Sequence, residues 1–438
     1  MTDFDDELMT APRRRRWWHL AAIDIGPLRR HRDYRLLFIG RFVSFFGTMI
    51  TSVAFPYQLY QLTHSVLIVG LVGVMEFAAI LAFAFLGGAL ADAKDRRSMV
   101  LLTEALLMVS SIVLAVNAVV PRPQVWLLFV VAAAWGLLDA MQRPSLDAML
   151  PRLVEKDELA AASALNSIRS TLGQILGPAL GGVLVAAFGL GVTYLVDVAS
   201  FAVGLVCLWS MRAIPPPADA VRPSIGRVLE GLRYAKSRQE LIGTYAVDMV
   251  AMFFGMPNAL FPAIAQLFGG ARVLGLLYAA PAAGSFLFSA TSGWTRHVQR
   301  HGMGVIVAAT VWGVAIVGFG LAPNLGVALF CLAVAGGADM MSGLFRSVIW
   351  NQTIPDSLRG RLASIELLSY TSGPSLGNFE AGAVASIFTV RVSVVSGGIL
   401  TVAGCVLCAL LLPGFRAYDA RRYHLAREAA SGDVKREK

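Results

Sequence analysis

Long apolar stretches alternate with short polar segments along nearly the whole chain. Each stretch reaches the roughly 20 residues that an α-helix needs to cross the hydrocarbon core of a bilayer. The pattern therefore predicts an all-α membrane protein with twelve transmembrane helices. The predicted spans are residues 36–59, 65–91, 98–119, 125–149, 159–187, 190–211, 240–268, 272–294, 303–322, 325–349, 362–388 and 392–413.

The positive charges are sorted by side between these spans. Of the 37 lysines and arginines, only Arg122, Arg272 and Arg391 fall in the loops on one side, and only Arg41 and Arg169 fall well inside spans. All the others lie on the opposite side. Because loops rich in lysine and arginine stay in the cytoplasm, we predict a multi-pass protein of the cell (inner) membrane with both termini cytoplasmic.

Composition agrees with a membrane protein. The chain has 56% hydrophobic and only 15% charged residues, whereas soluble domains carry about 25% charged residues. The net charge of +9 fits contact with anionic lipid head groups of the bilayer. Because the basic residues are scattered over short segments, we do not expect nucleic-acid binding.

The sequence contains no pattern that would support an enzyme or a cofactor. All four cysteines fall within predicted spans, without the spacing of a disulfide framework or a metal site. No phosphate-binding Gly-x-x-x-x-Gly-Lys-Ser/Thr run is present, so the chain carries no ATPase of its own. We therefore expect no cofactor, no metal and no enzymatic activity.

The predicted spans divide into two halves that echo each other. Asp139 has a counterpart in Asp339, and Gly177–Gly181 has one in Gly373–Gly377. Two parallel six-helix halves around a central cavity define the major facilitator architecture. The predicted parts are an N-terminal cytoplasmic tail, a six-helix bundle, a cytoplasmic linker with an amphipathic helix, a second six-helix bundle and a C-terminal tail, at residues 1–33, 34–211, 212–239, 240–414 and 415–438.

Two local motifs resemble signatures of the major facilitator superfamily. The loop Gly88–Arg97 resembles the signature that follows the second span, and it implies a gating role for Gly88, Asp92, Arg96 and Arg97. The other motif, in the fifth span, resembles the Gly-x-x-x-Gly-Pro-x-x-Gly-Gly pattern of antiporters, which in that family accompanies export. Its glycines, Gly173, Gly177 and Gly181, favour tight helix packing, and Pro178 removes a backbone hydrogen bond and bends the helix. We assign these four residues to gating.

Nearly the whole chain resembles the enterobactin-exporter branch of this superfamily, which adjoins the macrolide-efflux proteins. The chain departs from many drug antiporters in the fourth span, where Gly136–Asp139 replaces a deep arginine. The resemblance implies export of a small molecule by a monomer. It is carried by Arg41–Ser44, Pro56–Gln58, Thr63–Ser65, Gly88–Arg97, Leu277–Ala280, Pro355 and Gly360–Arg361.

Charged residues inside spans are expensive unless they face a cavity or a partner, so they mark candidate sites. Glu76 lies near the middle of the second span, and a buried carboxylate influenced by a nearby arginine suits proton coupling. We therefore predict proton-coupling roles for Glu76, Arg41 and Asp248, while a static Glu76–arginine pair remains the alternative. Asp139 and Arg143 are assigned to a gate network. Glu104 and Glu366 are expected near the inner surface, either solvated or paired with loop arginines.

The substrate cavity is expected to be aromatic and soft, because such surfaces accept bulky amphiphiles by burying area. An anionic siderophore would also need a positive group, for which we single out Arg169. The predicted substrate-binding residues are Arg169, Tyr57, Trp135, Phe254, Met341 and Glu380.

Together these features predict a proton-coupled exporter of a bulky organic molecule that works by alternating access. A siderophore is the first candidate substrate, and a macrolide or another lipophilic drug is the second. Two alternatives remain open at this point. One is an uptake permease, and the other is a non-transporting receptor or assembly platform on the same scaffold.

Overall fold

The structure is a computed structural model that describes residues 24–93, 95–214, 233–355 and 358–419. Within these ranges, the side chains of residues 83–93, 359–361, 363–365, 367 and 368 are left undescribed. Most of the predicted linker and both terminal tails lie outside the described residues, so the predicted amphipathic linker helix stays a prediction.

The described part of the chain consists of helices joined by short connections, without a strand. The first half contains α1 (Gly26–Arg30), α2 (Arg32–Thr63), α3 (Val66–Ala93), α4 (Arg96–Val119), α5 (Val125–Leu153) and α6 (Leu159–Trp209). The second half contains α8 (Gln239–Phe254), α9 (Phe261–Phe268), α10 (Ala271–Thr291), α11 (His301–Gly320), α12 (Leu325–Thr353), α13 (Arg359–Ile387), α14 (Val390–Leu411) and α15 (Pro413–Arg416).

The expectation of an all-α membrane protein is confirmed. Among the described residues, nine segments are long and apolar enough to cross a membrane. One of them includes α6, in which Gly189 has non-helical angles (φ 78°, ψ 176°) and separates two helices where the sequence predicted a break. The predicted span 240–268 is instead interrupted between α8 and α9, around Gly255–Pro257. The count of twelve spans stays a prediction.

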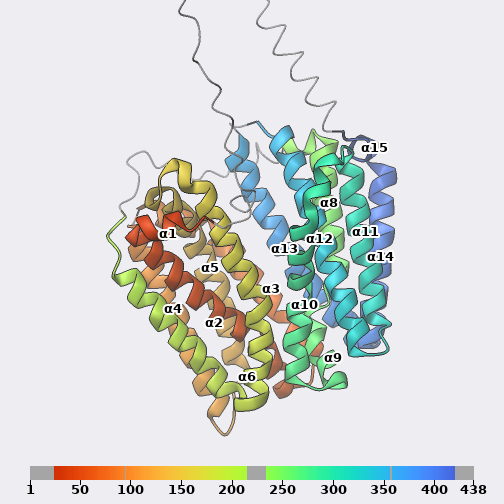
Figure 1. Cartoon of the computed structure of the whole chain (residues 1–438). Coiled ribbons are helices and arrows are strands. Elements are labelled where there is room, and N and C mark those ends of the chain that lie inside the picture. The colour runs from red at the N-terminus through yellow and green to blue at the C-terminus, as the bar shows by residue number, and fades with distance from the viewer. Residues whose placement is uncertain (1–23, 94, 215–232, 356–357, 420–438) are drawn as a thin grey trace, which may run out of the picture.

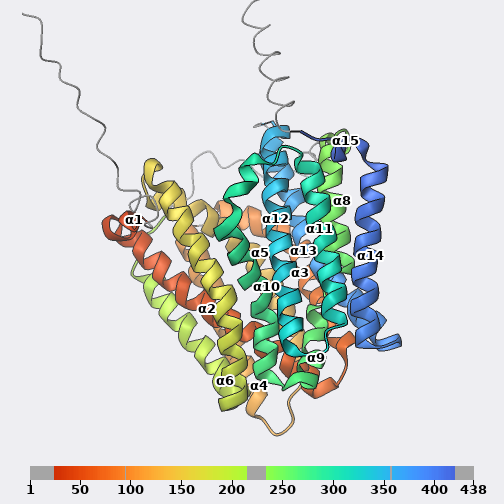
Figure 2. The ribbon, with the colours of Figure 1, turned by 45° about the vertical axis from the view of Figure 1, so that its right-hand side comes forward.

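The helices form two bundles (Figure 1). In the first bundle α2 packs against α6, and α3 packs against α5. In the second, α12 packs against α10 and α11, and α14 packs against α11. Figure 2 shows the bundles side by side, with α1 and α15 at one end of the molecule and α9 at the other. These ends are called the α1/α15 end and the α9 end below.

The two bundles are joined mainly near the α9 end. There α3 packs against α13, and α6 packs against α10. Glycine permits the close approach, because a Cβ on Gly182 of α6 would lie 2.5 Å from the Ala271 carbonyl oxygen and 2.9 Å from the Gly275 Cα. Likewise, a Cβ on Gly70 would lie 2.5 Å from the Asn378 carbonyl oxygen. In the direction of the α1/α15 end the two bundles diverge (Figures 1 and 2).

Candidate substrate cavities and buried charges

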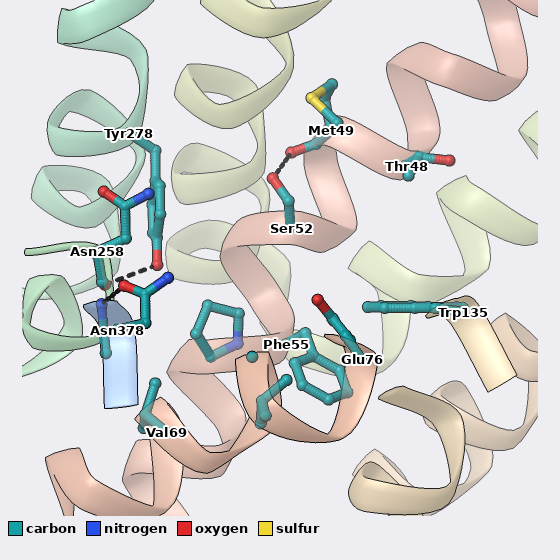
Figure 3. Close-up of a pocket in the computed structure, with 14 residues that line it drawn as sticks. Thr48, Met49, Ser52, Phe55, Val69, Glu76, Trp135, Asn258, Tyr278 and Asn378 are labelled. Carbon is teal, nitrogen blue, oxygen red and sulfur yellow. Dashed lines mark hydrogen bonds between the residues drawn. The ribbon is translucent and has the colours of Figure 1, made fainter. Parts of the chain in front are cut away.

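A central cavity of about 380 Å³ lies between the two bundles. Its walls come from α2, α3 and α5 of the first bundle and from the Asn258 segment, α10 and α13 of the second (Figure 3). Both halves of the molecule therefore contribute to one site. That arrangement suits a small molecule whose binding must respond to the relative position of the bundles.

Glu76 of α3 is the one charged residue among those lining the central cavity. Its side chain lies close to Trp135 in Figure 3, and the Trp135 ring centroid is 4.9 Å from that of Phe55. Within the described part of the chain, Glu76 has no ion-pair partner. The predicted substrate residue Trp135 and the predicted coupling residue Glu76 therefore share a cavity. The alternative of a static Glu76–arginine pair has no support among the described residues.

Amide groups form the opposite wall of the central cavity. The Asn378 Oδ1 accepts a hydrogen bond from the Ala259 backbone N–H at 2.9 Å, which leaves the Asn378 amino group free to donate. The Tyr278 hydroxyl donates to the Asn258 carbonyl oxygen at 3.1 Å. The sequence pattern did not single out these residues, because neutral polar side chains in spans are common and carry no charge signal.

A second cavity, of about 540 Å³, is lined by residues of the first bundle. We call it the N-half cavity. Thr48 and Met49 of α2 line both cavities, so the two are adjacent along one helix. Its charged lining residues are Arg41, Asp139, Arg143, Asp147 and Arg169.

Arg41 is held by a buried polar network. It donates to Glu104 Oε2 at 2.9 Å and to Gln142 Oε1 at 3.1 Å. Gln142 also donates to Glu104 Oε2, at 2.9 Å. The expectation that Glu104 is solvated or paired with a loop arginine is wrong, since Glu104 is 0% exposed and its partner Arg41 lies within α2. The Arg41 guanidinium and the Glu104 carboxylate form an ion pair. Arg41 is therefore a partner of Glu104 and not of Glu76.

Four further charged residues line the N-half cavity. Arg143 and Asp139 form a loose ion pair at 3.8 Å, one helical turn apart on α5, and both side chains are about half exposed. Asp147 follows one turn later. Arg169 of α6 donates to the Arg41 carbonyl oxygen at 3.2 Å. The predicted gate pair and the predicted substrate arginine are thus brought together in one cavity.

The second bundle contains its own buried ion pair. Asp248 of α8 pairs with Arg346 of α12, and their side chains are only 6% and 3% exposed. Asp339 lies 3.8 Å from the same guanidinium, which also sits 5.5 Å from the centroid of the Tyr370 ring. The statement that Arg41 and Arg169 are the deep arginines was wrong, because α12 extends to Thr353 and Arg346 is buried. The sequence does contain a sign of this burial: Arg346 follows Asp339 by seven residues, which places both side chains on one helix face.

One buried carboxylate was also not singled out by the sequence pattern. Asp197 of α6 is 1% exposed and accepts hydrogen bonds from the hydroxyls of Thr51 at 2.8 Å and Ser111 at 2.7 Å. Ser200 contributes a third at 3.3 Å. Hydrogen bonds from three elements satisfy this carboxylate, so Asp197 cross-links α2, α4 and α6 away from either cavity.

The predicted gating residues of the Gly88–Arg97 loop fall into two groups. The surroundings of Gly88 and the side chain of Asp92 lie outside the described part of the structure. Arg96 donates to the Ala148 carbonyl oxygen at 2.7 Å, and Arg97 donates to the Leu208 carbonyl oxygen at 2.9 Å. These bonds tie the start of α4 to α5 and to the end of α6, all within the first bundle.

The fifth-span motif packs on α2 and on the other half. A Cβ on Gly173 would meet the Phe45 ring, one on Gly177 would meet Met49, and one on Gly181 would meet Ile50. The carbonyl oxygen of Pro178 lies against Gly275 of α10. The motif therefore serves packing inside the first bundle and also the junction between the two halves.

Four other predicted residues line neither cavity. Tyr57 and Met341 pack against the hydrophobic core. The Phe254 ring lies 5.0 Å from that of Phe253, edge to face. Glu380 is two residues beyond Asn378 on α13 but is absent from the lining of the central cavity. Their substrate-binding roles remain predictions.

The family follows from a match over almost the entire sequence. Residues 23–437 match the family described as "Transmembrane secretion effector". The chain belongs to this family of major facilitator transporters. It is therefore a multi-pass membrane transporter, and it is identified with a transporter family and not with an enzyme family.

Curated relatives support the same branch. The chain is 28% identical to the enterobactin exporter EntS of Citrobacter koseri, over 89% of this chain and 94% of that protein. It is 26% identical to the enterobactin exporter EntS of Shigella boydii serotype 4, with the same coverage of both chains. The predicted resemblance to the enterobactin-exporter branch is confirmed.

Solved structures with the same fold are more distant in sequence. A peptide transporter of the POT family in complex with sulfate superimposes with a TM-score of 0.70 at 12% identity, over 89% of this chain and 96% of that one. A bacterial homologue of the iron transporter ferroportin in an inward-facing state gives 0.66 at 15% identity, over 88% and 98% of the two chains. These similarities concern the fold alone.

Proposed function

We propose that this transporter is a proton-coupled secondary exporter of a bulky organic molecule, with a siderophore as the first candidate substrate. The observation that carries the proposal is the central cavity, in which Glu76 and Trp135 of one bundle face Asn258 and Asn378 of the other. Similarity to enterobactin exporters over 89% of the chain supports the direction and the substrate class.

The lining of the central cavity suits a ring-bearing molecule with hydroxyl groups. Trp135 and Phe55 offer aromatic surface, while the Asn378 amino group can donate and Glu76 can accept hydrogen bonds. A catechol ring presents both an aromatic face and two adjacent hydroxyls. Such a group would satisfy the polar atoms on both walls at once.

Alternating access is supported by the way the two bundles meet. They pack closely at the α9 end through Gly70 and Gly182 and diverge towards the α1/α15 end. We place the protein in the inner membrane as a monomer with both termini in the cytoplasm. The α1/α15 end then faces the cytoplasm, so this arrangement corresponds to an inward-facing state. Export then requires the α9 end to separate and the α1/α15 end to close.

Coupling is assigned to Glu76 because the other predicted coupling residues are neutralised. Arg41 is paired with Glu104, and Asp248 is paired with Arg346. Glu76, in contrast, faces the cavity without a described ion-pair partner. A carboxylate that contacts the substrate site can bind either a proton or the substrate, and this competition exchanges one for the other across the membrane.

The proposal is tested by export from cells and from vesicles. A deletion strain grown under iron starvation should release less siderophore, and the plasmid-borne gene should restore release. Purified protein in sealed vesicles should then move the catecholate only when a pH gradient is imposed. Normal siderophore release by the deletion strain, together with gradient-independent movement in vesicles, would refute both parts of the proposal.

A multidrug efflux pump is the second candidate, and one observation favours it. The charged residue lining the central cavity is a carboxylate, which suits a lipophilic cation. Ethidium efflux measured in the same deletion strain separates the two substrates. Strong dye efflux without a change in siderophore release would make this alternative the primary function.

A further inference from the structure

Arg169 differs from the other deep arginines in the partners it has. Arg41 is paired with Glu104, and Arg346 is paired with Asp248. Among the described residues, no carboxylate lies within ion-pair distance of Arg169. A lone charge at membrane depth is costly, so this guanidinium requires another source of compensation.

The protein satisfies Arg169 only in part. One amino group donates to the Arg41 carbonyl oxygen at 3.2 Å, and the guanidinium carbon lies 5.2 Å from the centroid of the Phe45 ring. The Arg169 Nε is buried and has no hydrogen-bond partner among the described residues. An arginine presents five N–H donors in a planar fork that matches a carboxylate. Arg169 therefore retains unused capacity for an anion.

Arg169 lines a cavity, so its side chain does not face only lipid. The N-half cavity has a volume of about 540 Å³. Its acidic groups, Asp139 and Asp147, lie on α5, where Asp139 is engaged by Arg143 at 3.8 Å and is half exposed. Neither carboxylate lies within ion-pair distance of Arg169.

Part of the cavity wall is aromatic. The partly exposed rings of Phe38 and Phe45 line it, together with the amide of Asn166. Such rings bury a planar ligand by area and by stacking. A site that combines an unsatisfied guanidinium with two ring faces matches an aromatic anion better than a small inorganic ion.

We propose that the N-half cavity is a separate subsite for an aromatic anion, such as a hydroxybenzoate-type group, and that Arg169 receives its carboxylate. The proposal rests on the proposed export function for its biological direction, but the binding itself does not depend on transport. Because Thr48 and Met49 line both cavities, an anionic group held at Arg169 lies beside the route to Glu76 in the central cavity.

The experiment compares a charged and a neutral ligand with the same ring. Binding of salicylate and of salicylamide is measured by calorimetry on the purified full-length protein in phosphatidylcholine nanodiscs. The variants are Arg169→Gln, Arg169→Lys and, as a matched control, Arg122→Gln, which removes one arginine from a loop outside both cavities. Thermal unfolding of each variant shows whether it remains folded.

Salicylate affinity should fall by about tenfold or more in Arg169→Gln, as expected for a charge-assisted hydrogen bond. It should be largely retained in Arg169→Lys and unchanged in Arg122→Gln, and salicylamide should bind all folded variants alike. Equal salicylate affinity in wild type and Arg169→Gln would overturn the proposal.

A second arm distinguishes a lipid head group from the aromatic ligand. Nanodiscs containing phosphatidylglycerol are compared with the neutral ones. Arg169-dependent enrichment of phosphatidylglycerol without Arg169-dependent salicylate binding would overturn the proposal in favour of a lipid site. Normal siderophore release by the deletion strain would refute the proposed function while leaving this binding result intact.

Discussion

The contact between Gly182 and Gly275 should determine how readily the α9 end opens. A Cβ added at Gly182 would lie 2.5 Å from the Ala271 carbonyl oxygen, whereas carbon–oxygen contacts are normally about 3.3 Å or longer. In Gly182→Ala, α6 and α10 must therefore separate by about 0.8 Å to restore a normal contact. Overpacking of this kind costs about 1–3 kcal/mol.

This cost falls on one conformation only. The two helices belong to different bundles, so the steric conflict disappears when the α9 end opens. A bias of about 1–3 kcal/mol corresponds to a shift of about 5–150-fold in the ratio of the two states. Gly182→Ala should thus populate a state that is open at the α9 end and closed at the α1/α15 end.

The shift can be followed by double electron–electron resonance, which measures the distance between spin labels at Gln61 and Leu267. The labels are attached in a variant whose four native cysteines are replaced. Gln61 lies near the end of α2, and Leu267 is an exposed residue of α9. Distances between the two labels should lengthen and spread in Gly182→Ala.

Two control substitutions separate gating from general damage. A Cβ on Gly136 would lie 2.4 Å from the Glu76 carbonyl oxygen, but both residues belong to the first bundle. Gly136→Ala should therefore lower the unfolding temperature without moving the label distances. At Gly337 the nearest atom would be 3.4 Å away, so Gly337→Ala should change neither. Unaltered distances in folded Gly182→Ala would refute the gating role of this contact.

Three further predictions concern the buried charges. Glu76→Gln should abolish pH-gradient-driven export in proteoliposomes while substrate binding persists, and full gradient-driven export would exclude Glu76 as the coupling site. Arg346→Gln should destabilise the protein by about 3–5 kcal/mol, because Asp248 is left buried and unpaired. Unfolding in detergent should show partial recovery of stability when Asp248→Asn is added. An unchanged unfolding free energy in Arg346→Gln would mean that the pair is solvated. Asp197→Ala should cost about 1–3 kcal/mol for each hydroxyl that loses its acceptor, whereas Asp197→Asn should cost less, and equal unfolding temperatures for both would contradict the hydrogen-bond account.

The boundaries of most helices followed directly from hydropathy. Apolar length and flanking charge are local properties of the chain, and a bilayer leaves a spanning segment little choice but a helix. The break at Gly189 was anticipated for the same reason. The interruption between α8 and α9 was not, because residues 249–268 carry no charge that would mark an end.

The charged residues show where sequence pattern alone stops. Depth along a span indicated that Glu76, Arg41 and Asp248 matter, but depth does not reveal which neighbour each one meets. Glu104 was expected to be solvated or paired with a loop arginine and is instead buried against Arg41. Arg346 was grouped with the charges of the cytoplasmic side and is instead buried against Asp248. Each partner comes from a different helix, so the pairing depends on how the helices are rotated and packed.

The sequence by itself therefore determined the helical membrane architecture, the family and the set of residues too polar to face lipid. Hydrophobicity, charge sorting and small-residue motifs act over one helix or one loop, and they can be read along the chain. Only the tertiary structure decided that Glu76 meets Asn258 and Asn378 across a central cavity, and that Arg169 is left without a described carboxylate. These relations join segments that lie up to about 300 residues apart, and they arise from packing between bundles, which no local pattern encodes.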